Sequence, residues 1–445
     1  MIFFVNLVFC QPPSIDWQGR YGGTDSNLSY DSKQTLDGGY IIGGRSNSNI
    51  SGDKTENSKG GFDYWILKLD ANGIKQWDRT IGGNDHEVFY SIIQSNDGGY
   101  VVSGTSYSIS FGGDKSENNV GLTDYWIVKL SSTGVIEWEN TIGGDLVDEA
   151  TCVIETNDNG FLVGGYSRST ASGDKTENSK GENDYWIVKL NALGQVQWDK
   201  TIGGSNNDIL YSIVQLADDN YVLLGRSGSN VSGDKTENSR GGNDYWIVKL
   251  DSTSLNIIWQ KTIGGSLEDM PFEIIKTLDN GFLLGGESNS NISGDKTENS
   301  RGLEDYWVVK LNALGTIEWQ KTIGGSSSDS MLGMIQTQDG GYLLGGNSLS
   351  PISGDKTENI IGAFDGWLVK LNETGTTIEW QKAIGGTLGD GFNSISNTID
   401  GGYFLSGLTN SSISGNILLP PIGQIDYWVV KLQPEALTTS IFEND

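Results

Sequence analysis

Tryptophan recurs along the whole chain at a fixed spacing. One set lies 60 or 61 residues apart, each member followed closely by a Gly-Gly pair, at Trp17, Trp77, Trp138, Trp198, Trp259, Trp319 and Trp380. A second set keeps the same period, at Trp65, Trp126, Trp186, Trp246, Trp307, Trp367 and Trp428. Because the two sets contain all 14 tryptophans of the 445 residues, the sequence predicts seven copies of one unit rather than three ordinary domains.

The second copy shows what one unit contains. Apolar runs bounded by turn residues predict four strands, at 89–95, 100–106, 124–130 and 136–142. Three of the four connections are short, so neighbouring strands should pair as an antiparallel meander. No segment has a sustained apolar period of about 3.6 residues, and we therefore expect essentially no helix.

The two ends of the repeated region predict how the units are arranged. The first strand, around Trp17, is the fourth strand of a unit, and the last strand, at 426–432, is a third strand. If the units formed an open row, the first strand and the incomplete last unit would both lack partner strands. In a closed ring the first strand completes the last unit. The sequence therefore predicts an all-β, seven-bladed β-propeller with four antiparallel strands per blade, closed by the N-terminal strand.

The predicted propeller covers residues 12–432. Its blades are expected at about 24–83, 84–144, 145–204, 205–265, 266–325, 326–386 and 387–432 plus 15–23. We interpret residues 1–11 as a residual signal peptide, because Met1–Cys10 is apolar but too short to span a bilayer, and 433–445 as a C-terminal linker or tail. The mature chain would then keep Cys152 alone, so no disulfide framework is expected and this residue should be small and buried.

A glycine lies in the middle of each predicted second strand. These residues are Gly44, Gly104, Gly165, Gly225, Gly286, Gly346 and Gly407. Glycine weakens a strand unless another group must approach closely, and an aromatic ring from a neighbouring strand or blade is the expected group. We predict that the tryptophans fill the space between the blades.

The charge of the chain narrows its range of partners. With 57 acidic residues against 29 basic ones, the formal net charge is -28. Such an excess repels phosphate backbones and anionic lipids, so binding to nucleic acid or to a membrane surface is not expected. Cations, sugars and basic proteins are the better candidates.

Acidic residues recur at three positions on one face, because alternating strand directions gather the long loops there. The first position precedes the first strand, and we expect it to form a ligand-binding ring near the axis: Asn27, Glu87, Asp148, Asp208, Asp269, Asp329 and Asp390. The second opens the third strand: Asp63, Asp124, Asp184, Asp244, Asp305, Asp365 and Asp426. The third lies in the repeated loop Ser-Gly-Asp-Lys-Thr-Glu-Asn. We call this face the long-loop face.

Alternating oxygen side chains in the repeated loop resemble the first half of a calcium loop. The candidate ligands are Asp53, Asp174, Thr176, Asn178, Asp234, Asp295 and Asp355. The match is partial, because no glycine follows the third ligand and no bidentate Glu stands at a fixed distance. The alternative is that Asp and Asn bond to their own backbone while Lys175 pairs with nearby carboxylates, in which case no cofactor is required.

Two further features could form a ligand site. A polar column on the first strands consists of Gln34, Gln94, Glu155, Gln215, Lys276, Gln336 and Asn397, of which Gln94, Gln215 and Gln336 are the ligand-binding candidates. It is either a solvated channel lining or an amide ring that binds sugar or peptide. The seventh-copy loop, at 413–425, is the largest break in the repeat and the expected place for a unique site.

Enzyme motifs are scarce. His86 is the single histidine and lies in a loop, so neither a catalytic triad nor a zinc cluster is supported. The Gly-Asp-Lys-Thr run places Asp before Lys and does not match a phosphate loop. Carboxylate chemistry of the glycosidase kind is what remains.

Several motifs resemble a known group of proteins. Asp-Tyr-Trp-Ile-Val-Lys-Leu, Thr-Ile-Gly-Gly, Asp-Gly-Gly-Tyr and Ser-Gly-Asp-Lys-Thr-Glu-Asn are similar to motifs of repeat β-propellers in secreted and cell-surface proteins of Bacteroidetes-type bacteria. The resemblance covers about residues 15–432, and the tail at 437–445 is similar to the linker before a type IX secretion sorting domain. It implies a surface location, with binding or scaffolding and no catalytic residues to carry over.

Three functions follow as hypotheses. The first is a monomeric, extracellular, non-enzymatic binding, adhesion or scaffold module whose long-loop face contacts glycan, protein or cation. The alternative is a polysaccharide-active enzyme that uses carboxylates in the axial funnel. The third is a purely structural spacer.

Overall fold

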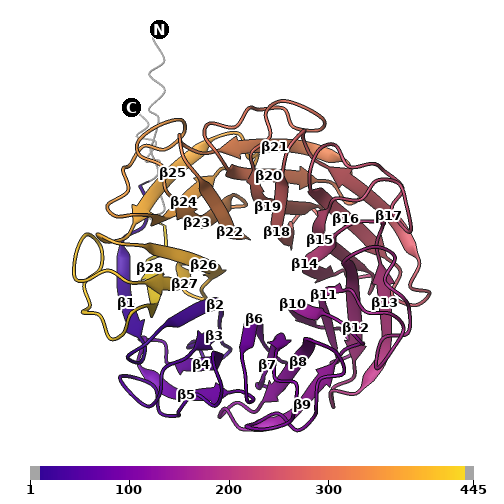
Figure 1. The fold of residues 1–445 in the computed structure, drawn as a ribbon. Helices are drawn as coiled ribbons and strands as arrows, with labels where there is room; N and C mark the ends of the chain where they lie inside the picture. The colour runs from indigo at the N-terminus through magenta and orange to yellow at the C-terminus, as the bar shows by residue number, and fades with distance from the viewer. Residues whose placement is uncertain (1–10, 436–445) are drawn as a thin grey trace.

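The computed structural model describes residues 11–435, and these form a seven-bladed β-propeller (Figure 1). Within this part of the chain, 28 strands make seven four-stranded antiparallel sheets around a central axis, and there is no helix. The predicted fold class is therefore confirmed. The predicted signal peptide up to Cys10 and the tail from 436 onward lie outside the described residues.

Each blade runs from an inner strand at the axis to an outer strand at the rim. Blades 1 to 3 consist of β2 (Asn27–Gln34), β3 (Tyr40–Ser46), β4 (Asp63–Leu69) and β5 (Lys75–Ile81); β6 (Glu87–Gln94), β7 (Tyr100–Ser106), β8 (Asp124–Leu130) and β9 (Ile136–Ile142); and β10 (Asp148–Glu155), β11 (Phe161–Ser167), β12 (Asp184–Leu190) and β13 (Val196–Ile202). Blades 4 and 5 consist of β14 (Asp208–Gln215), β15 (Tyr221–Ser227), β16 (Asp244–Leu250) and β17 (Ile257–Ile263); and β18 (Asp269–Lys276), β19 (Phe282–Ser288), β20 (Asp305–Leu311) and β21 (Ile317–Ile323). Blades 6 and 7 consist of β22 (Asp329–Gln336), β23 (Tyr342–Ser348), β24 (Asp365–Leu371) and β25 (Ile378–Ile384); and β26 (Asp390–Asn397), β27 (Tyr403–Thr409), β28 (Asp426–Leu432) and β1 (Ile15–Tyr21).

The strands of blade 2 lie almost where the sequence places them. β7, β8 and β9 coincide with the predicted ranges, and β6 begins at Glu87 rather than at the predicted Phe89. The acidic position that was expected to precede the first strand is therefore the first residue of that strand. No helix of the described residues is long and apolar enough to cross a membrane.

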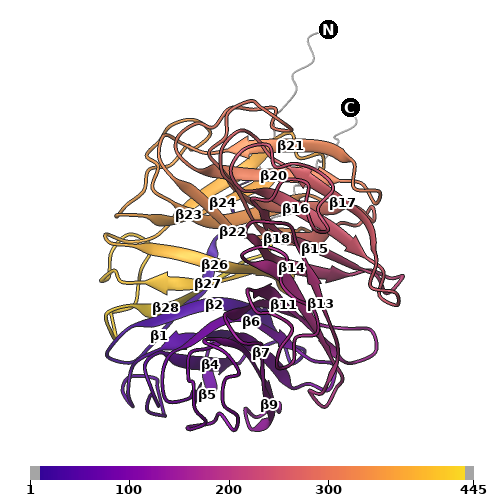
Figure 2. The same cartoon turned by 45° about the vertical axis from the view of Figure 1, so that its right-hand side comes forward.

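A β-bulge interrupts every inner strand at the same position. The pairing between the first and second strands skips one residue in each blade, namely Tyr30, Tyr90, Thr151, Tyr211, Phe272, Leu332 and Asn393. A bulge redirects a side chain away from the regular alternation of the strand. All seven of these residues consequently line the central channel, around which β14, β18, β22 and β26 lie side by side (Figure 2).

Neighbouring blades are joined by a tyrosine that covers the mid-strand glycine. The Tyr64 hydroxyl donates to the carbonyl of Trp126 in the next blade at 3.2 Å, and any side chain at Gly104 would collide with this tyrosine. Equivalent bonds start from Tyr125, Tyr185, Tyr245, Tyr306 and Tyr427 at 2.9–3.1 Å. The expected aromatic group is thus present, but it is tyrosine. The tryptophans of the third strands lie beside it with no exposed surface.

The interface between blades 6 and 7 uses a different residue. Gly366 occupies the position of the tyrosine, so blade 6 cannot donate this bond. Phe392 of β26 fills the space, lying against Gly366 and stacking on Trp428 with ring centroids 4.9 Å apart. The aromatic packing is therefore kept, although the hydrogen bond is lost.

The ring is closed by β1, which pairs with β28 in antiparallel register. Arg20 of β1 donates to the Asp426 carboxylate at 2.6 Å and to the Ser411 carbonyl at 2.6 Å, and this ion pair is buried. In five of the other blades the residue equivalent to Arg20 is a threonine, and the cation is instead a loop lysine such as Lys54. Blade 7 has Ile417, packed in the core against Trp428, at the lysine position.

The seventh-copy loop therefore differs for a structural reason. The cation of blade 7 is supplied by the closing strand, and Ile417 fills the room that the loop lysine takes elsewhere. This exchange makes β1 specific for blade 7, which is the blade it completes.

Arg20→Thr should destabilise the fold by about 3–5 kcal/mol, because it leaves the Asp426 carboxylate buried without its cation. The matched control is Arg79→Thr on β5, whose ion pair with Glu56 is partly exposed and should contribute at most about 1 kcal/mol. Adding Ile417→Lys to Arg20→Thr restores the Lys54 and Thr80 arrangement of blade 1 and should recover much of the loss. Urea unfolding measures all four proteins, and equal losses for Arg20→Thr and Arg79→Thr would contradict this account.

Candidate functional site

The first acidic ring is buried. Asn27, Glu87, Asp148, Asp208, Asp269, Asp329 and Asp390 have no exposed surface. Each carboxylate accepts a hydrogen bond from the second glycine of the preceding Gly-Gly pair, as Asp208 does from the Gly204 amide at 2.6 Å, and most also accept one from a serine hydroxyl, as Asp208 does from Ser229 at 3.0 Å. These residues hold the loop that enters each blade, and in this arrangement a ligand in the channel does not reach them.

The second acidic ring is buried beside the first. Asp184 accepts hydrogen bonds from the Lys180 and Gly181 amides and lies against Gly203, where a side chain would collide with its carboxylate. The same contact explains the first glycine of every Gly-Gly pair. Burial raises the pKa of Asp184 to about 6, and the neighbouring Asp208 carboxylate adds to this shift.

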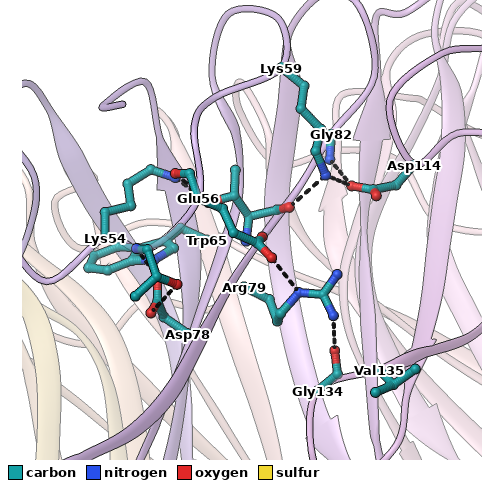
Figure 3. A network of polar contacts seen from close by, with 12 residues as sticks. Lys54, Glu56, Lys59, Trp65, Asp78, Arg79, Gly82, Asp114, Gly134 and Val135 are labelled. Atoms are coloured by element: carbon teal, nitrogen blue, oxygen red, sulfur yellow. Dashed lines mark hydrogen bonds and ion pairs between the residues drawn. The ribbon is translucent and has the colours of Figure 1, made fainter. Parts of the chain in front are cut away.

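The third acidic position joins neighbouring blades on the long-loop face. Asp114 accepts from the Gly82 amide at 3.1 Å and pairs with Lys59 of the preceding blade (Figure 3). Asp234, Asp295 and Asp355 pair in the same way with Lys180, Arg240 and Arg301. Asp53 and Asp174 accept from the Gly22 and Gly143 amides at 3.2 and 3.1 Å.

The oxygens proposed as calcium ligands do not converge on one point. Thr176 donates its hydroxyl to Asp199 at 2.6 Å, whereas the side-chain oxygen of Asn178 accepts from the Ala171 amide at 2.8 Å. Among the described residues there is no group of three or more His, Cys, Asp or Glu that could hold a metal ion. The arrangement is not the shell of six to eight oxygens that calcium takes, and calcium binding stays a prediction.

The loop lysines lie against tryptophan rings. The Lys175 ammonium is 5.3 Å from the ring centroid of Trp186 and donates to the Thr201 hydroxyl, while Lys54 takes the same position over Trp65 (Figure 3). The nearby carboxylates of Asp148 and Asp199 attract the Lys175 ammonium and favour its charged form, although neither forms a direct ion pair with it. Burial lowers the pKa of Lys175 to about 8. The main partner of this ammonium is therefore an aromatic face.

The polar column bridges adjacent blades on the face opposite the long loops. Gln94 accepts from the Leu36 amide of the preceding blade at 2.8 Å and donates to the Gly98 carbonyl of its own turn at 3.3 Å. Gln215 and Gln336 bond in the same way to the amides of Asn157 and Leu278. The side-chain amides of these glutamines therefore bond within the protein, and ligand binding by the column stays a prediction.

The long-loop face exposes apolar side chains at the tips of its loops. One residue precedes Ser-Gly or Gly-Gly at the tip of each long loop, and we call these the loop-tip residues: Ile50, Phe111, Ala171, Val231, Ile292, Ile352 and Ile413. Apart from Ala171, each is a large apolar residue with 57–65% of its surface exposed. Six of them donate their amide to the asparagine of the loop motif, as Ile292 does to Asn299 at 3.0 Å.

A cavity of about 540 Å³ occupies the central channel. It is lined by residues of all seven inner strands, and its charged lining residues are Asp31, Lys33 and Glu273. Cys152 also lines it and is buried and free, as the sequence predicts. Sequence reasoning missed this cluster and the loop-tip residues. A signal for the cluster is present, because Asp31 and Glu273 interrupt a column of Ser, Cys and Gly.

The chain is only distantly similar to known proteins. No family model matches the chain. A regulatory protein of Caulobacter vibrioides, FlaEY, is 24% identical over 356 residues, which cover 74% of this chain and 37% of that protein. The chain thus spans little more than a third of the length of this relative.

Solved structures show low similarity. They include hydrazine synthase from Kuenenia stuttgartiensis (TM-score 0.49, 9% identity, 87% of this chain and 94% of that one) and BamB from Moraxella catarrhalis (TM-score 0.40, 12% identity, 94% and 99%). A protein of unknown function from Dyadobacter fermentans has a TM-score of 0.46 at 12% identity, over 79% of this chain and 97% of that one. None of these similarities carries an argument about function.

Because several buried carboxylates have raised pKa values, we expect the free energy of unfolding to rise as the pH falls from about 8 to about 5. Burial raises the pKa of Glu87 to about 8 and those of Asp124, Asp184, Asp269 and Asp305 to about 6. The folded chain then binds protons that the unfolded chain has released, so this stabilisation is complete near pH 4 and is lost as the pH rises through these values. The midpoint of thermal unfolding should therefore be higher near pH 5 than near pH 8.

Asp208→Asn provides the specific test. Burial raises the pKa of Asp208, and blade 1 already has an amide, Asn27, at this position. The variant should melt close to the wild type near pH 5 and lose less stability between about pH 5 and 8. Asp145→Asn, at a carboxylate whose pKa is lowered by hydrogen bonds from Thr170, should leave the profile in this range unchanged. A melting point that rises from pH 5 to 8 in the wild type would contradict the prediction.

Proposed function

We propose that this chain is a non-enzymatic binding module and that its long-loop face contacts a protein partner. The observation that carries the proposal is the ring of loop-tip residues. Six large apolar side chains, each more than half exposed, recur at the same position of successive blades. Their recurrence at one position of six blades, on loops whose backbone is held by hydrogen bonds, makes these side chains candidates for a shared contact surface.

The loop motif explains how the loop-tip residues are held. Asn238 fixes the Val231 amide and Asp234 accepts from the Gly203 amide, so the polar side chains of the loop are used inside the protein. The apolar tip is left outside on a fixed backbone. A pre-ordered surface loses little conformational entropy on binding, and full burial of one such side chain contributes about 1.5–3 kcal/mol.

The charge around the loop tips indicates the chemistry of the partner. Asp85, Asp145, Glu182 and Glu268 are exposed in loops of the same face, and the whole chain has a formal charge of -28. A basic protein surface with apolar side chains at its centre complements this face. The resemblance to secreted and cell-surface propellers supports placing this contact outside the cell.

The geometry does not favour the enzyme alternative. The ring carboxylates that were expected in the axial funnel have no exposed surface. A glycosidase needs two carboxylates on either side of a bound sugar, and buried ones cannot meet that requirement.

Site-specific photo-crosslinking in cells of the source organism tests the proposal. A benzophenone amino acid at Ile292 or Val231 should give adducts with a protein partner, whereas the same amino acid at Leu278 or Leu36, in the tight turns of the opposite face, should not. The control is well matched, because Leu278 is 78% exposed and Ile292 is 61% exposed. The adduct yield should fall as salt is raised, since the attraction is between opposite charges. Equal adducts from both faces, or none from the loop tips, would overturn the proposal.

A further inference from the structure

The central channel departs from sevenfold symmetry at one cluster of charges. At the position after each bulge, Asp31 and Glu273 stand where the other blades have Ser91, Cys152, Ser212, Gly333 and Ser394. Lys33 likewise stands where most other blades have Ile or Val. These charged side chains from blades 1 and 5 meet in the cavity of about 540 Å³.

Asp31 is fully occupied by protein groups. Its Oδ1 atom accepts from Lys33 at 2.8 Å and from the Ser394 hydroxyl of blade 7 at 3.1 Å, and its Oδ2 atom accepts from the Ile92 amide of blade 2 at 3.1 Å. Asp31 therefore bridges three blades. Together with Lys33 it forms an ion pair with no net charge.

The Glu273 carboxylate uses one of its two oxygens in a hydrogen bond to the protein. Its Oε2 atom accepts from the Met334 amide of blade 6 at 2.7 Å, and among the described residues its Oε1 atom has no hydrogen-bond partner. The three side chains together have a net charge of -1 when Glu273 is ionised. The Lys33 ammonium cannot cancel this charge, because it already neutralises Asp31.

Aromatic rings line the same cavity. Tyr30, Tyr90, Tyr211 and Phe272 all project from the bulge positions. The rings of Tyr211 and Phe272 lie 5.8 Å apart in an edge arrangement. Phe272 directly precedes Glu273 in the chain, and all three residues line the cavity. A carboxylate beside aromatic faces is the combination that attracts an organic cation, through charge and through the quadrupole of the rings.

We propose that the channel is a binding site for a small organic ammonium ion, whose charged group lies against Glu273 and the aromatic rings. The cavity volume is within the range of small-molecule sites. A metal cation fits less well, because one free carboxylate oxygen in an aromatic and aliphatic lining cannot supply six to eight oxygen ligands. An anion would face an uncompensated carboxylate. This site is independent of the contact proposed for the long-loop face.

Isothermal titration calorimetry on the whole chain tests the proposal with choline and its neutral isostere 3,3-dimethylbutan-1-ol. Choline should bind saturably at millimolar concentrations or below, and the alcohol should bind at least about tenfold more weakly because it has the same shape without the charge. Equal affinity for the two, or no saturable binding of choline, would overturn the proposal.

Two channel variants should shift the affinity in opposite directions. Glu273→Gln keeps the acceptor for the Met334 amide but removes the charge, so choline should bind about tenfold more weakly or worse. Lys33→Met leaves Asp31 without its cation and makes the channel more negative, so choline should bind more tightly. Glu318→Gln on the outer strand β21, where the residue pairs with Lys310, should change nothing. If Glu273→Gln fails to fold, Lys33→Met still decides the matter, since unchanged or weaker binding would refute the site.

The pH profile gives a second readout. Burial raises the pKa of Glu273 to about 7, and Lys33 opposes this shift while Asp31 adds to it. The other groups that face it are Tyr211 on β14, whose pKa burial also raises, and the Met334 amide on β22. Choline should therefore bind about tenfold more weakly near pH 6 than near pH 8.5. Glu273→Gln should abolish this dependence, and a flat profile in the wild type would count against the assignment.

Discussion

The hydrogen bond from a tyrosine of one blade to a tryptophan carbonyl of the next is the contact on which the ring depends. It requires a tyrosine on the third strand, a glycine on the facing second strand and a buried tryptophan beside both, as in Tyr125, Gly165 and Trp186. Since the three positions recur in nearly every unit, most blades meet their neighbours through the same hydrogen bond. Where the tyrosine is missing, Phe392 restores the packing. This repeated interface brings the inner strands to the axis and so creates the channel.

A second constraint comes from the charges buried at the same interfaces. Six blades contain a buried carboxylate of each ring, whereas blade 1 has Asn27 in place of the first. In most blades one loop lysine lies over a tryptophan, so the buried carboxylates outnumber these cations. The carboxylates are retained because they bind backbone amides of the Gly-Gly turns that connect the blades. The acidic motif thus has hydrogen-bond partners within the protein, and ligand binding by it stays a prediction. The apolar loop tips and Glu273 of the charged cluster in the channel are among the groups left free for binding.

The fold was predictable because its determinants are local and repeat at a fixed period. The tryptophan spacing predicts seven units, and the turn residues predict strand ends such as those of β7 and β8. Ring closure followed from the phase of Trp17 and Asp426. These features need no knowledge of how distant side chains are oriented.

The site was harder to predict because it depends on the direction of side chains. The spacing of Asp208 predicts a side chain that faces the axis. In the structure its carboxylate is buried and accepts a hydrogen bond from the Gly204 amide of the preceding turn. The bulge shifts which residues face the channel, and Lys33 and Glu273 are more than 200 residues apart in the sequence. Only the closed ring brings them together. The sequence shows that Arg20 and Ile417 stand where most other blades have a threonine and a lysine. Only the pairing of β1 with β28 explains why the two positions change together.

Hydrogen–deuterium exchange of the Gly-Gly turns that connect the blades tests most directly whether the acidic motif serves the structure rather than a ligand. The account predicts that the Gly83, Gly144, Gly204, Gly265, Gly325 and Gly386 amides, which donate to the first acidic ring, are protected like the sheet amides in the isolated chain with a chelator present. Added calcium should leave their exchange unchanged. Fast exchange that slows when calcium is added would contradict the account and would identify the motif as a ligand site.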